Sequence, residues 1–218
     1  MTSPYINTKL YTIVSLSASQ MDNNIYSHLK NNLIKKLENK CFKHYGCITK
    51  IYEILDKKGG YIESENPMGS ASFDVKFSCR LSFPLKNRFI ICKVDQTTQA
   101  LTSVSNGPIK VILTNDRINP EHFTAGRTGI FVKSINGMKP LAQGDHVKIK
   151  IDARKFNDKD TIIMCMGILS SIANEDEIKK FMEDEYNYSS KYIDYDKFIH
   201  LEDTNNKINI GDLSEEEN

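Results

Sequence analysis

The stretch FDVKFSCRLSF, residues 73–83, decides the fold of the first part of the chain because its apolar and polar residues alternate strictly. Such alternation is typical of a β-strand that has one buried face. The apolar set is predicted to face the core: Phe73, Val75, Phe77, Cys79, Leu81 and Phe83. The polar set is predicted to face solvent or a partner: Asp74, Lys76, Ser78, Arg80 and Ser82.

The residues before this strand are predicted to form two further strands and a helix that can pack against it. Residues 10–18 alternate like a second strand, and residues 45–55 form a third. Between them an apolar residue recurs at every fourth position, which predicts an amphipathic helix capped near residues 22–24: Met21, Ile25, Leu29, Leu33 and Leu37. DKKGG, residues 56–60, is predicted to be a turn, followed by a loop over residues 61–72. Residues 1–83 therefore form a small α+β domain.

From Pro84 onward the pattern changes to short strands separated by glycine turns. We predict strands at residues 87–95, 99–104, 108–114, 129–135, 144–156 and 161–171. Five or six such strands favour a closed or partly closed β-barrel, and an OB fold is the leading candidate for residues 84–171. Residues 174–186 are predicted to form a short helix within a C-terminal tail, residues 172–218, whose last dozen residues are expected to be disordered.

Charge is distributed unevenly along the 218 residues. The whole chain carries 29 basic and 28 acidic residues, but residues 171–218 hold 14 acidic and only 5 basic ones. The body is therefore basic, which suits a polyanionic partner, and the tail is acidic. Five scattered cysteines without a secretory signal predict a reducing, intracellular compartment, and no apolar run is long enough to span a bilayer.

We find no motif for catalysis or for a cofactor. The glycines form no phosphate-binding loop and no nucleophile elbow. Cys41, His44 and Cys47 are spaced like metal ligands, but a structural zinc site needs a fourth ligand and none is close in sequence. Two buried cysteines and a surface histidine are the simpler interpretation. The sequence thus predicts no enzyme, no metal and no cofactor.

Several segments, in order, resemble the seventh-largest subunit of eukaryotic RNA polymerase II and its archaeal E-prime counterpart. The segments are LENKCFKHYGCI, GGYIESENPMGSASFDVKF, FPLKNRFIICKVD, NGPIKVILT and GDHVKIKI, and the resemblance covers residues 10–171. It implies a non-catalytic stalk subunit with a truncated ferredoxin-like tip domain and an OB-fold domain. The asparagine, lysine and isoleucine content also fits a protist or a large DNA virus.

The resemblance further implies partners and docking residues. The tip loop would wedge into the polymerase core through Asn66, Pro67, Met68, Gly69, Ser70 and Phe73. A stalk partner similar to the fourth-largest subunit is a second candidate partner, and nascent single-stranded RNA is a third. The protein would act in the nucleus if cellular, and in a cytoplasmic factory or virion if viral.

The barrel carries a row of basic residues predicted to lie on its outer face: Lys93, Lys110, Lys148, Lys150, Arg154 and Lys155. One interpretation is an ordinary solvated face, and the other is a groove that follows the backbone of RNA. The segment QTTQAL, residues 96–101, lacks the aromatic residue usual in the family, so binding would be weak and independent of sequence. A free-standing OB-fold RNA-binding factor in translation or RNA decay remains the alternative function.

Overall fold

The computed structural model describes residues 3–62, 69–127, 129–134, 137–189, 198–199 and 207–208, which form two compact units. The barrel unit takes residues 1–5, 39–47 and 82–192, and the sheet unit takes residues 6–38, 48–81 and 193–218. In the part of the chain that is described, no helix is long and apolar enough to cross a membrane.

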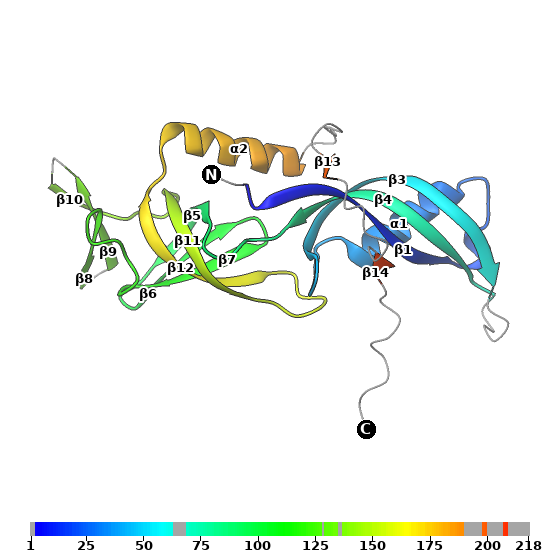
Figure 1. The fold of residues 1–218 in the computed structure, drawn as a ribbon, viewed down its shortest axis with the longest axis horizontal. Helices are drawn as coiled ribbons and strands as arrows, with labels where there is room; N and C mark the ends of the chain where they lie inside the picture. Colours follow the sequence, from blue (N-terminus) through cyan, green and yellow to red (C-terminus); the bar gives the residue numbers. More distant parts are fainter. Residues whose placement is uncertain are drawn as a thin grey trace, which may run out of the picture. The chain divides into compact units, whose positions relative to one another are not determined.

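The sheet unit is built as strand, helix, strand, strand (Figure 1). Its elements are β1 (Tyr5–Leu16), the 3-10 helix η1 (Ala18–Gln20), α1 (Ile25–Leu37), β3 (Gly46–Ile62) and β4 (Ala71–Ser82). The strand order is β1-β4-β3, so the last strand lies between the other two. This arrangement confirms the predicted α+β class.

Helix α1 packs on the sheet through the predicted apolar stripe. Leu29, Leu33 and Leu37 are completely buried. At the edge of the stripe, the side-chain amide of Asn32 donates to the Ser15 carbonyl at 3.1 Å, and Lys36 Nζ donates to the Ile13 carbonyl at 3.0 Å. The predicted amphipathic helix is therefore confirmed, and these polar contacts fix it against β1.

The predicted turn at residues 56–60 is wrong, because β3 continues through both glycines to Ile62. Gly60 lies against the ring of Phe73 on β4, where an added Cβ would be only 2.8 Å from the ring carbons. The ammonium group of Lys57 lies 5.5 Å from the centre of the same ring. Gly60 thus leaves room for a cross-strand aromatic residue instead of reversing the chain.

The prediction for the polar face of β4 is wrong for its second half. Ser78, Arg80 and Ser82 are buried, whereas Asp74 and Lys76 are partly exposed. The Arg80 carbonyl accepts a hydrogen bond from Thr49 Oγ1 at 3.0 Å. The hydroxyl of Ser78 donates to the Glu53 carbonyl at 3.4 Å. Alternation shows that the two faces of a strand differ, but it does not show that the polar face is exposed.

The acidic tail contains two short strands. β13 (Phe198–Ile199) and β14 (Lys207–Ile208) both pair in parallel with β1. Lys207 and Ile208 belong to the stretch that was expected to be disordered, so that expectation is wrong for these two residues; the remainder of the stretch lies outside the described residues. The edge of β1 offers unpaired backbone groups, and pairing with them requires little apolar burial.

The centre of the barrel unit is a closed barrel of five strands: β5 (Phe89–Thr97), β6 (Leu101–Asn106), β7 (Ile109–Thr114), β11 (His146–Lys155) and β12 (Ile163–Ile172). Neighbours follow the order β11-β12-β7-β6-β5, and β5 closes onto β11. All pairs are antiparallel except β7 with β12. The predicted closed barrel is confirmed.

The barrel encloses an apolar core to which every strand contributes. Fully buried side chains include Val104, Val111, Leu113, Val147 and Ile149. The segment 39–47, with β2 (Lys40–Phe42), adds Cys41 and Cys47 to this core. Its backbone bonds to the turn after β11, because Cys41 N donates to the Asp160 carbonyl at 2.6 Å and Lys159 N donates to the Cys41 carbonyl at 2.8 Å.

Two further elements complete the barrel unit. β8 (Phe123–Gly126), β9 (Gly129–Ser134) and β10 (Gly137–Pro140) form a separate antiparallel sheet inserted between β7 and β11. The strand predicted at residues 129–135 thus belongs to this insertion and not to the barrel. Helix α2 (Glu175–Ser189), as predicted, follows β12 and lies across β5 and β11 (Figure 1).

Candidate functional site

The basic strip begins on β11, whose alternation is as predicted. Val147, Ile149 and Ile151 are completely buried in the barrel, and Lys148 and Lys150 between them lie on its outer side. A bulge between Ile151 and Ala153 shifts the register, and the last residues of the strand, Arg154 and Lys155, are exposed. Strand alternation therefore places lysines outside, but it does not say what each one contacts.

Lys148 is already committed to an internal contact. Its Nζ lies 2.7 Å from Glu177 Oε1 on α2 and 5.6 Å from the centre of the Phe89 ring. Burial alone would raise the pKa of Glu177, but hydrogen bonds from Lys148 and from the Asn174 backbone outweigh it and lower that pKa. The carboxylate is therefore ionised at neutral pH and holds Lys148 beneath the helix.

Arg154 is also engaged within the barrel unit. Its Nη1 donates to the Pro84 carbonyl at 2.6 Å, and its guanidinium carbon lies 3.8 Å from the centre of the Phe83 ring. Both contacts tie the end of β11 to the residues that lead into β5. A guanidinium stacked on an aromatic ring has a positioning role that a lysine would not reproduce.

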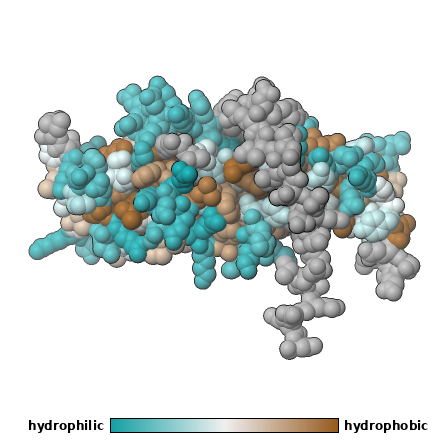
Figure 2. All heavy atoms as spheres, in the orientation of Figure 1, coloured by the Kyte–Doolittle hydropathy of each residue, from teal (hydrophilic) through white to brown (hydrophobic). Residues whose placement is uncertain are grey.

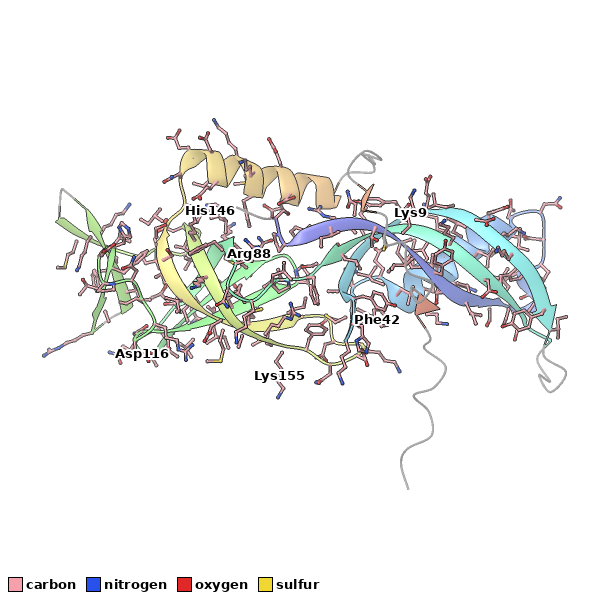
Figure 3. The ribbon with its side chains drawn as sticks, in the orientation of Figure 1. Lys9, Phe42, Arg88, Asp116, His146 and Lys155 are labelled. Carbon is pink, nitrogen blue, oxygen red and sulfur yellow. The ribbon has the colours of Figure 1, made fainter. Side chains whose placement is uncertain are left out.

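Three lysines of the strip are placed beside β12 by the strand register. In the strand register Lys155 of β11 and Lys110 of β7 lie on either side of Met164 of β12. Lys150 lies between Phe89 of β5 and Ile168 of β12. Figure 3 shows Lys155 projecting away from the barrel at the opposite end of β11 from His146. Lys110 and Lys155 are exposed and Lys150 is partly exposed.

Lys93 lies on the far side of Lys110 from β12. It is exposed on β5 opposite His146, and Ser105 separates it from Lys110. His146 lies beneath α2, where its ring meets the ring of Phe181 edge-on with centroids 5.1 Å apart (Figure 3). Burial lowers the pKa of His146, and the charge of Lys93 lowers it further. Within the predicted strip, Lys148 and Arg154 are thus held by contacts within the barrel unit, whereas Lys110, Lys150 and Lys155 flank β12.

The sequence interpretation missed the apolar residues between these lysines. Met164, Met166 and Ile168 of β12 point outward and are 39, 45 and 38% exposed, and Phe89 beside Lys150 is 38% exposed. A signal was present in TIIMCMGILSS, residues 161–171, where both alternating sets are apolar. A barrel strand has only one inner face, so the second apolar set had to lie outside.

The β3–β4 hairpin carries the predicted docking residues, and the structure describes three of them. Phe73 is only 7% exposed beneath Gly60, while Gly69 and Ser70 are partly exposed. Gly69 has a φ of +59°, a conformation that favours glycine. Asn66, Pro67 and Met68 lie outside the described residues. Tyr61 and Ile62, at the end of β3, are 46 and 63% exposed and were missed by the sequence interpretation.

The three residues of the possible metal triplet differ in their exposure to solvent. Cys41 and Cys47 are buried and their thiols hydrogen-bond to each other, whereas His44 is exposed. The hydrogen bond with Cys41 and burial both raise the pKa of Cys47, so this thiol stays protonated. Across the described ranges, the structure contains no group of three or more His, Cys, Asp or Glu side chains arranged to hold a metal ion.

Two comparisons with known proteins bear on this arrangement. Residues 12–67 match the family model of the SHS2 domain found in the N terminus of Rpb7p, Rpc25p and MJ0397. Over 183 residues the chain is 33% identical to a protein of Acanthamoeba polyphaga mimivirus whose name assigns it as a DNA-directed RNA polymerase subunit. That match covers 84% of this chain and 90% of the relative. The chain belongs to the Rpb7-type family of DNA-directed RNA polymerase subunits.

Membership of the Rpb7-type family selects between the functions that the sequence left open. It favours a polymerase subunit in transcription over a free-standing RNA-binding factor, and the mimivirus relative supports the viral context. Rpb7-type subunits are accessory subunits, so core polymerase subunits are partners of this chain. The SHS2 match covers the last five residues of β1 and all of α1 and β3, whereas the mimivirus match is long enough to include most of the barrel unit as well.

Proposed function

We propose that this chain is a stalk subunit that docks on the polymerase core through the end of its β3–β4 hairpin and contacts nascent RNA weakly through its barrel. The sheet order β1-β4-β3 supports a truncated ferredoxin-like tip for residues 1–83 as part of this proposal. The strand order of the barrel, with its one parallel pair, supports an OB fold for residues 84–171. A stalk partner similar to the fourth-largest subunit remains part of this proposal.

The observation that carries the docking proposal is the exposure of Tyr61 and Ile62 beside the predicted docking loop. Ile62 is the second most exposed large apolar side chain among the described residues, and Tyr61 adjoins it. Aromatic and aliphatic side chains at the end of a hairpin can enter a pocket on a partner with little loss of conformational freedom. Phe73, being buried, supports the hairpin from within, and Pro67 and Met68 remain predicted contacts.

The test is recovery of the polymerase with the tagged full-length chain from cells that contain the cognate enzyme. Replacing Tyr61 and Ile62 together by Asp should weaken docking by more than about thirtyfold, the size of a hot-spot loss. Met21→Asp is a matched control, because Met21 is also an exposed apolar residue of the sheet unit. Normal recovery of core subunits with the double variant would contradict docking through this hairpin.

The RNA proposal rests on charge. Lys110, Lys150 and Lys155 are the members of the strip that flank β12, and Ser105 of β6 separates Lys93 from Lys110. Because contacts to phosphates depend on counterion release, changing the three to Gln should flatten a plot of log affinity against log salt by about two units for single-stranded RNA.

A matched control triple uses lysines that are exposed on other elements of the same unit: Lys139, Lys179 and Lys180. Fluorescence anisotropy with an unstructured oligonucleotide measures both variants and the parent chain. A slope that is the same for the two triples would remove the RNA contact from this side of the barrel.

A further inference from the structure

Exposed apolar side chains gather on one short segment of the barrel unit. Among the described residues, fifteen large apolar side chains are exposed, and five of them lie within residues 162–172: Ile162, Met164, Met166, Ile168 and Ile172. Single exposed apolar residues are ordinary, but a contiguous set on a protein surface marks an interaction site. Met164, Met166 and Ile168 follow one another along the outer face of β12, and we call these three the β12 stripe.

Among the described residues, the β12 stripe lies outside the apolar core of the barrel and outside the cluster beneath α2. Helix α2 lies across β5 and β11, and the buried face of β12 is the other one, with Ile163, Cys165 and Leu169 in the core. β12 pairs with β11 on one side and with β7 on the other. Its backbone therefore offers no free edge, and a ligand must bind by side chains across the face of the sheet.

The strand register places lysines at both ends of the stripe, and the acidic residue between them on β11, Asp152, is already paired with Arg117 at 2.7 Å. Lys155 and Lys110 flank Met164, and Lys150 flanks Ile168. The next position inward, Met166, has Ala153 and Ile112 as its neighbours. The surface is thus an apolar strip of about 13 Å, at about 3.3 Å per residue, with cations at both ends.

RNA alone does not account for such a surface. Single-stranded nucleic acid binds through lysines to its phosphates and through aromatic rings to its bases. The stripe itself offers thioether and aliphatic side chains, which have no π-face for a base. The neighbouring aromatic ring, Phe89, is 38% exposed, and the ammonium group of Lys148 lies 5.6 Å from its centre. A protein segment, by contrast, can bury aliphatic side chains against methionines, whose flexible chains adapt to a partner, while its carboxylates meet the lysines.

We propose that the β12 stripe, with Lys110, Lys150 and Lys155, binds a short segment of another protein of the polymerase assembly in which aliphatic residues are flanked by Asp or Glu. This inference rests on membership of the polymerase and does not require contact with RNA. If RNA is held by the same lysines, the segment and RNA compete for them.

The two methionines of the stripe provide their own probe. Methionine oxidation follows exposure, so hydroxyl-radical footprinting of the full chain, free and in purified polymerase, reports the covering of Met164 and Met166 directly. Both should be oxidised in the free chain and at least about threefold more slowly in the complex. This protection should survive digestion of RNA and decrease when the salt concentration is raised.

A variant separates the segment from a general effect of assembly. In Met166→Ser/Ile168→Thr, Met164 remains as reporter, and its protection in the complex should be lost although the chain still co-purifies. Leu101→Thr is the matched control, because Leu101 is an equally exposed aliphatic residue of the barrel on β6. Failure of docking itself would be distinguishable from loss of this protection, because the chain would then be absent from the purified polymerase.

Three results would overturn the proposal. Equal reactivity of Met164 and Met166 in the complex and in the free chain would mean that nothing covers the stripe. Protection that disappears with RNA digestion would assign the stripe to RNA. Protection already present in the isolated full chain would assign it to the chain's own residues or to a second copy.

Discussion

The two sides of the barrel carry the same kinds of residue and use them differently. Beside α2, Lys148 pairs with Glu177 while Ile91 packs with Phe181 and Ala173. Around β12, Lys110 and Lys155 flank Met164, and the apolar side chains are exposed. Figure 2 shows that the outer side of α2 is hydrophilic. Lysines on the outer face of a strand therefore indicate a binding surface only where they are not ion-paired with another element of the same chain.

The largest expected effect distinguishes the two faces of β12. Gly167 faces inward, and a Cβ there would lie 2.6 Å from Ile149 Cγ2 and 2.8 Å from the Lys150 carbonyl oxygen. Gly167→Ala should lower the free energy of unfolding by about 2–3 kcal/mol, because the clash includes backbone that cannot move aside. Ile168→Ala, one residue away and outward, should change it by less than about 1 kcal/mol. Equal losses in urea denaturation would contradict the assigned orientation of β12.

The opposite orientations of Gly167 and Ile168 also illustrate which features of the structure can be predicted from the sequence. Alternation predicted every barrel strand and the inward set of β11, because the period of a strand is a local property. It did not show that α2 would take Lys148, since that ion pair joins residues 29 positions apart. It placed Phe73 on the core face but could not reveal that Gly60 packs on its ring, because a turn was expected at residues 56–60 and β3 instead continues to Ile62.

The next prediction concerns the packing of α2 on the barrel through Phe181. Phe181 is 9% exposed and packs against Ile91 and His146. Phe181→Ala should lower the free energy of unfolding by about 2 kcal/mol, since most of an aromatic side chain loses its contacts. The adjacent Met182 is 48% exposed, so Met182→Ala is the control and should have little effect. Denaturation curves followed by circular dichroism measure both, and similar curves would show that α2 is not anchored by Phe181.

A smaller effect is expected from releasing Lys148 alone. Glu177→Gln removes a partly exposed ion pair, which contributes less than about 1 kcal/mol to stability. It also returns one cation to the surface, so the salt slope of RNA binding should steepen by about 0.7. Asp176→Asn changes the net charge equally without touching Lys148. If both variants bind RNA identically, the pairing with Glu177 does not restrain Lys148.

The smallest effect concerns pH. Burial and then the charge of Lys93 lower the pKa of His146, so the folded state binds this proton less readily than the unfolded chain does. Its contribution is complete above a pH of about 6.5 and is lost as the pH falls toward the lowered pKa. The melting temperature of the parent chain should therefore fall more on acidification than that of His146→Gln. Parallel pH profiles for the two proteins would show that His146 does not titrate on unfolding.

The segment 39–47 has a consequence for how the chain can be divided and made. It precedes the barrel by some forty residues in sequence, yet Cys41 and Cys47 complete the barrel core. A fragment that begins at residue 84 would lack these two core side chains and the backbone bonds to residues 159 and 160. During synthesis this segment leaves the ribosome before the barrel strands do. The barrel can therefore finish folding only after residues far along the chain have emerged.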